Sequence, residues 1–88
     1  MAKVADQTVT VRYFAAARAA AGSDSEQLSL PSGATVSELV DGLAGRSQEL
    51  ARVLTRCSYL CDGVALRNQD QPLQAGNTID VLPPFAGG

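Results

Sequence analysis

The residues with the clearest chemical potential are the final ones, Pro83-Pro84-Phe85-Ala86-Gly87-Gly88. Two prolines remove consecutive backbone donors and favour polyproline geometry, so a strand cannot continue through them. The two glycines carry no side chain to bury. Residues 83–88 are therefore predicted to form a thin tail, with a reach of about 20 Å, that can present the Gly88 carboxylate inside a narrow channel of another protein. The alternative is an end without function, since most termini are poorly ordered.

Cys57 and Cys61 are the other residues that could do chemistry. Two thiols in a chain without histidine fall short of a structural zinc site. In a strand, residues four apart lie about 13 Å from each other, too far for a disulfide. We therefore expect two reduced, mostly buried thiols and no metal site. The absence of histidine also removes the commonest general base from the chain.

Composition indicates one small globular domain. The chain has 88 residues, 45% of them hydrophobic, with a net charge of −2 and a pI of about 4.8. Without a cluster of Lys or Arg, the sequence argues against a nucleic-acid or anionic-membrane surface. No apolar run approaches transmembrane length and the N-terminus lacks the apolar core of a signal peptide, so a cytoplasmic protein is expected.

Alternating hydrophobicity predicts the first and last strands, over residues 8–14 and 78–82. Shorter strands are predicted over 26–30, 58–61 and 64–66, and Asp62-Gly63 is typical of a tight turn. An alanine-rich stretch predicts a helix over 15–21 that ends at Gly22. Thr35 and Glu38 match a capping box that begins the main helix, which Gly45 ends, and Ser47 is expected to cap another helical segment.

These elements predict an α+β fold, a mixed sheet of about four to five strands packed on one main helix. The first and last strands are expected to be central, adjacent and parallel, which gives a ubiquitin-like β-grasp domain over residues 1–82 followed by the tail, 83–88. The predicted core comprises Val9, Val11, Tyr13, Leu28, Leu30, Val36, Leu39, Val40, Leu43, Leu54, Leu60, Ile79 and Val81.

Phe14 and Leu82 each end a strand on the side opposite its inward residues. If the two strands are neighbours, these side chains lie together on the outer sheet face, and Phe85 extends the apolar surface along the tail. Such a cluster beside a reactive tail indicates a docking surface. Alternatively, the loop around Leu66 and Leu73 folds over them.

Short motifs spread over nearly the whole chain resemble one known family. They are Tyr13-Phe14-Ala15, Arg18, Gly22, the Asp62-Gly63 turn, Gln71-Pro72-Leu73, Ala75-Gly76-Asn77 and the segment from Leu82 to Gly88. This pattern resembles the molybdopterin synthase small subunits, the MoaD branch of the MoaD/ThiS sulfur-carrier family. The Pro-Pro-x-x-Gly-Gly ending is its most specific part and favours that branch over the thiazole-pathway branch. Asp62-Gly63 and the longer loop from Arg67 to Gln71 depart from the family's pattern.

The resemblance implies a non-catalytic, sulfur-donating subunit. An adenylyltransferase/sulfurtransferase would consume ATP to join AMP to Gly88, and a persulfide sulfur would replace AMP to give a thiocarboxylate. The synthase large subunit, in a heterotetramer, would receive the tail, with Gly87 allowing access. The resemblance implies no tightly bound cofactor. The residues expected to contact the partner are Phe14, Leu82, Pro83, Pro84, Phe85 and Ala86.

Three other functions remain open from the sequence. The chain could carry sulfur for a thiazole or thiamine pathway. It could be a ubiquitin-like modifier that forms isopeptide bonds with lysines, or an interaction module whose tail is inert.

Overall fold

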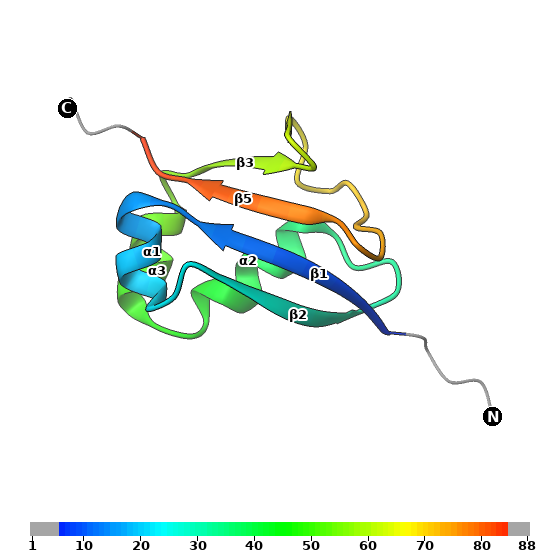
Figure 1. Cartoon of the computed structure of the whole chain (residues 1–88), viewed down its shortest axis with the longest axis horizontal. Coiled ribbons are helices and arrows are strands. Elements are labelled where there is room, and N and C mark those ends of the chain that lie inside the picture. The colour runs from blue at the N-terminus through cyan, green and yellow to red at the C-terminus, as the bar shows by residue number, and fades with distance from the viewer. Residues whose placement is uncertain (1–5, 85–88) are drawn as a thin grey trace.

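Residues 6–84, described by a computed structural model, form a mixed sheet with helices against one face (Figure 1). The sheet order is β2-β1-β5-β3-β4, so β1 and β5 are internal while β2 and β4 form the edges. This is the predicted β-grasp fold, with the main helix after Thr35 and the two shorter helices predicted over residues 15–21 and after Ser47. The elements are β1 (Asp6–Tyr13), α1 (Ala15–Ala21), β2 (Ser25–Pro31), α2 (Val36–Ala44), α3 (Gln48–Leu54), β3 (Ser58–Cys61), β4 (Val64–Ala65) and β5 (Thr78–Leu82).

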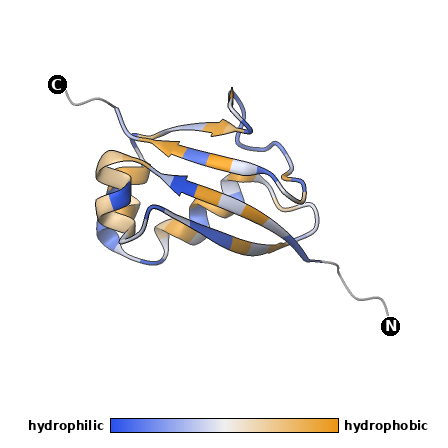
Figure 2. Cartoon of the chain, viewed as in Figure 1, coloured by the Kyte–Doolittle hydropathy of each residue, from blue (hydrophilic) through white to orange (hydrophobic). Residues whose placement is uncertain are grey.

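The predicted parallel pairing of the first and last strands is confirmed. Val11 lies opposite Ile79, and Tyr13 lies opposite Val81. A parallel pair needs a long crossover, which the intervening helices and strands supply. The alternation of apolar and polar residues along both strands is visible in Figure 2. As a result, the chain leaves an internal strand of the sheet at Leu82, directly before Pro83.

Local capping explains where the helices begin and end. The Thr35 hydroxyl accepts a hydrogen bond from the Glu38 amide at 3.2 Å, and the Glu38 carboxylate accepts one from the Thr35 amide at 2.8 Å. This reciprocal pair is the predicted capping box of α2. Ser47 caps α3 by accepting from the Leu50 amide at 3.0 Å. Gly22 ends α1 with a φ of 83°, a left-handed conformation that favours glycine.

The core lies between the sheet and the helices, and most of the predicted residues are in it. Leu60 is a wrong prediction: β3 turns Tyr59 and Cys61 inward and leaves Leu60 half-buried on the outer face. Tyr59 fixes this orientation because its buried hydroxyl donates to the Leu54 carbonyl at 2.9 Å. The buried core comprises Val9, Val11, Tyr13, Ala17, Val36, Leu39, Leu43, Leu50, Leu54, Tyr59, Cys61, Leu73, Ile79 and Val81.

Three other predicted core residues contact the core without being fully buried. Leu28 and Leu30 of β2 and Val40 of α2 pack against it but are only partly buried. Their inward orientation is as predicted, whereas their degree of burial is lower, in the case of Leu28 and Leu30 because β2 is an edge strand.

A polar cluster ties β1 and β2 to the end of α2. The Tyr13 hydroxyl donates to Glu26 at 2.6 Å, and the Arg46 guanidinium donates to the same carboxylate oxygen at 2.7 Å. The hydrogen bond from Arg46, together with that from Tyr13, lowers the pKa of Glu26 although partial burial opposes the shift. Burial and the Glu26 carboxylate raise the pKa of Tyr13, so its hydroxyl stays a donor.

We expect Glu26→Gln to lower the free energy of unfolding by about 1–2 kcal/mol at pH 7, since charge-assisted hydrogen bonds are lost at a partly exposed site. A lowered carboxyl pKa stabilises the fold above the unfolded value of about 4.3 and is lost as the pH falls. The difference between variant and wild type should therefore shrink below about pH 4. Urea unfolding across this pH range measures it, and a difference that persists undiminished at low pH would contradict the assignment.

Candidate functional site

The outer face of the sheet carries an apolar cluster at the end where β5 finishes. The β1–β5 register continues from Tyr13 opposite Val81 to Phe14 beside Leu82, and the Phe14 amide donates to the Val81 carbonyl at 3.2 Å. Both side chains are half-buried. Leu60, from β3, lies on the same face opposite Asp80. We call Phe14, Leu60 and Leu82 the outer cluster.

An ion pair lies among these apolar residues. Arg12 Nε lies 3.1 Å from Asp80 Oδ1, an ionic contact without the alignment of a good hydrogen bond. The Arg12 guanidinium also lies over the Phe14 ring, 5.2 Å from its centroid. The Asp80 side chain is 13% exposed and the Arg12 side chain 51% exposed, so the ion pair extends from the sheet face to the surface. The outer cluster thus combines apolar side chains with one ion pair and a cation–π contact.

The proposed alternative for this surface, a loop that covers Phe14 and Leu82, is wrong. Leu73 is buried in the core, where its amide donates to the Ala34 carbonyl at 2.8 Å, and Leu66 packs against the core. Neither residue covers the outer cluster.

The beginning of the tail rests against the helices. Pro83 and Pro84 line a shallow apolar cavity of about 180 Å³ together with Ala16, Val53 and Arg56. In Figure 1, α1 and α3 lie at the end of the sheet where β5 finishes. The two prolines therefore follow directly from an internal strand, close to α1 and α3 and next to Leu82 of the outer cluster. Phe85, Ala86, Gly87 and Gly88 lie outside the described residues.

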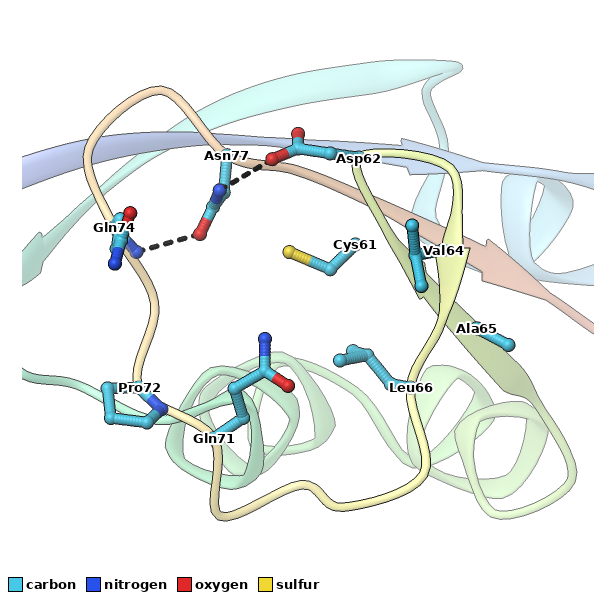
Figure 3. A pocket seen from close by; sticks show the side chains of 9 residues that line it. All are labelled: Cys61, Asp62, Val64, Ala65, Leu66, Gln71, Pro72, Gln74 and Asn77. Atoms are coloured by element: carbon cyan, nitrogen blue, oxygen red, sulfur yellow. Dashed lines mark hydrogen bonds between the residues drawn. The ribbon is translucent and has the colours of Figure 1, made fainter.

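A second cavity, of about 510 Å³, lies at the other end of β5. Figure 3 shows Cys61, Leu66 and Gln71 around it, with the Asn77 amide donating to Asp62 at 2.7 Å. Burial raises the pKa of the Cys61 thiol, and burial likewise raises that of Cys57, so both stay protonated near neutral pH. Both cysteines are free, as expected. A protonated thiol is a poor nucleophile, so this cavity adds no evident chemistry to the tail.

Two surveys were confined to the described part of the chain. Within residues 6–84, no group of histidine, cysteine and carboxylate side chains could hold a metal ion. Over the same range, no helix has both the length and the apolar character needed to span a membrane.

Solved structures with the same fold come from archaea and bacteria. SAMP1 from Haloferax volcanii is 26% identical, with a TM-score of 0.79, covering 92% of this chain and 99% of that one. A putative molybdopterin converting factor subunit 1 from Pyrococcus furiosus is 28% identical, with a TM-score of 0.81, covering 90% and 99%. A complex of molybdopterin-converting factor subunits 1 and 2 from Helicobacter pylori 26695 is 24% identical, with a TM-score of 0.69, covering 93% and 100%, which bears on the fold alone.

No curated protein matches the sequence. The ThiS family, in contrast, matches residues 11–88, which extend from Val11 in β1 through β5 to the end of the tail. With the β-grasp fold and the position of Pro83 and Pro84 at the end of β5, this match gives the conclusion: the chain belongs to the ThiS family of ubiquitin-like β-grasp sulfur carriers.

Proposed function

We propose that the chain is the small subunit of a molybdopterin synthase, which donates sulfur from a thiocarboxylate formed at Gly88 during molybdenum cofactor biosynthesis. The observation that carries this proposal is the placement of Pro83 and Pro84, which continue from internal strand β5 beside the outer cluster. A docking face next to a tail suits a carrier whose terminus must enter another protein. The similarity to the Pyrococcus protein supports the choice of pathway.

In the proposed reaction this chain is the substrate of an activating enzyme, which modifies its Gly88 carboxylate. A carboxylate is a poor acyl donor, so an activating enzyme first joins the Gly88 carboxylate to AMP from ATP, releasing pyrophosphate. The terminal sulfur of a persulfide on the sulfur donor then displaces AMP and gives an acyl disulfide. A second thiol attacks the donor's sulfur, which releases the thiocarboxylate and leaves a disulfide on the donor. The large subunit contributes the acid–base groups, which agrees with the absence of histidine from this chain. The protein works in the cytoplasm and needs no tightly bound cofactor of its own.

The partner protein is proposed by analogy with a solved complex. The Helicobacter structure holds subunits 1 and 2 of the converting factor together. By analogy we propose that a large subunit binds the outer cluster and takes in residues 83–88, in a heterotetramer.

A protein modifier is the second candidate function. SAMP1 is named as a small archaeal modifier protein. SAMP1 from Haloferax volcanii is 26% identical to this chain, close to the 28% of the Pyrococcus protein. A modifier would join Gly88 to lysine side chains through isopeptide bonds.

One reconstitution separates the pathways. The thiocarboxylate form is mixed with the molybdopterin synthase large subunit and the sulfur-free precursor, or with a thiazole synthase and its substrates. Molybdopterin formation in the first mixture alone is expected. Product formation only in the second mixture, or lysine conjugates in a lysate without molybdopterin formation, would overturn the assignment to molybdopterin synthase.

Charge in the outer cluster should weaken docking. Phe14→Glu or Leu82→Glu is expected to weaken binding to the large subunit at least about tenfold, or 1.4 kcal/mol, because a carboxylate would be desolvated against the partner. Thermal stability should change little, since both side chains lie outside the core. The control is Thr8→Glu, an exposed position on the same sheet face at the other end of β1. Titration calorimetry that gives wild-type affinity for both cluster variants would place the docking face elsewhere.

A further inference from the structure

The edge formed by β2 combines free backbone groups with an apolar groove. Within residues 6–84, β2 pairs with β1 alone and forms one edge of the sheet. Between this strand and α2 lies a cavity of about 230 Å³. It is lined by Leu28, Ser29, Leu30, Glu38, Leu39, Gly42, Leu43 and Arg46. The partly exposed side chains of Leu28 and Leu30 therefore line a groove beside an edge strand.

The hydrogen-bond pattern shows which backbone groups are free. The Tyr13 amide donates to the Asp24 carbonyl at 2.8 Å, and Val11 lies opposite Glu26. In an antiparallel ladder the bonded residues alternate, so Glu26, Leu28 and Leu30 face β1 with their backbone groups. The N–H and C=O groups of Gln27 and Ser29 consequently point away from the sheet. From Ser25 to Ser29 this edge has no outward-facing charge, and the proline that blocks pairing, Pro31, stands only at its last position. The central part of the edge is therefore a template for another strand.

We propose that this edge binds a second copy of the chain, through antiparallel pairing of the two β2 strands about a two-fold axis at Leu28. In that register Gln27 of one copy lies opposite Ser29 of the other, and each such pair exchanges two backbone hydrogen bonds. Leu28 meets its own counterpart, so the two apolar grooves join into one buried surface. Such an interface is isologous, as most homodimer interfaces are.

Charge supports the second copy as the occupant. Arg46 lies beside Glu26 near the start of β2, whereas Glu38 lines the groove near Leu30 at the strand's other end. A two-fold antiparallel pairing brings Arg46 of each copy to the Glu38 end of the other. Gly42 lines the groove, and a Cβ at this position would meet no atom within 4 Å, so α2 leaves open space there. The outer cluster and Pro83 lie on or directly after β1, β3 and β5, away from the free edge of β2, so a dimer leaves them accessible.

Sedimentation equilibrium of the full chain tests the proposal. From micromolar to millimolar concentrations the mass is expected to rise from 9.1 kDa towards twice that value. Gln27→Pro removes an outward N–H that β1 does not use and should weaken dimerisation at least about tenfold. Gln27→Ala keeps the N–H and should dimerise as wild type does. Glu38→Gln, which retains a capping acceptor, should weaken the dimer and reduce its salt dependence.

Amide hydrogen exchange of the wild-type chain is a second test, which does not depend on whether Gln27→Pro folds. In wild type, the Gln27 and Ser29 amides should gain protection from hydrogen exchange as concentration rises, while the Leu28 amide, which already faces β1, changes less. A mass that stays at 9.1 kDa at millimolar concentration, or a dimer unaffected by Gln27→Pro and without protection at Ser29, would overturn the proposal.

Discussion

Deleting Gly88, or adding one residue after it, is expected to abolish sulfur transfer while the fold persists. The acyl carbon to be activated is that of the terminal residue, and a channel that fits two glycines cannot align a displaced carboxylate. The core is built from residues between Val9 and Val81, so the free energy of unfolding should change by less than about 0.5 kcal/mol. Thiocarboxylate formation and urea unfolding measure the two effects.

The variant Gly87→Val tests whether the tail must be narrow to enter the partner's channel, while the terminal residue Gly88 is unchanged. The Gly88 carboxylate is intact in this variant, yet the branched side chain restricts the backbone and widens the tail. We expect a folded protein with slower transfer, and Pro83 and Pro84 should keep their place at the end of β5. Normal transfer from the deletion or the extension would mean that Gly88 is not the reactive residue.

Ile79→Ala or Leu39→Ala should cost about 2–5 kcal/mol of unfolding free energy, because each removes a large buried side chain and leaves a cavity. That is a large share of the stability of a small domain. Val64→Ala is the control, since Val64 is 68% exposed and should change stability by less than about 0.5 kcal/mol. Denaturant unfolding measures all three. Losses below about 0.5 kcal/mol at both buried positions would show that the sheet faces are assigned wrongly.

The parts of the fold that depend on local chemistry could be predicted from the sequence. The β1 and β5 faces follow from strict alternation, and the α2 start follows from Thr35 and Glu38. Leu60 was assigned to the wrong face because a four-residue strand offers two plausible faces. The choice is made by the tertiary contact of Tyr59 with Leu54. Leu73 is buried although it follows a polar loop, since its burial depends on backbone pairing with Ala34.

The candidate site, too, could be predicted only in part from the sequence. Phe14 and Leu82 could be placed together because each follows from the alternation of its own strand. The contact of Arg12 with Asp80 could not, because it depends on the register of two strands far apart in sequence. The roles of Phe85, Ala86, Gly87 and Gly88 stay predictions, since these residues lie outside the described range.

The most direct test of the sulfur-carrier role is the intact mass of the chain after incubation with its activating enzyme, ATP and a persulfide donor. The account predicts an increase equal to the replacement of one oxygen by sulfur, located at Gly88 by fragmentation and absent without ATP. An unchanged mass under conditions in which the same enzyme loads a known carrier would contradict it.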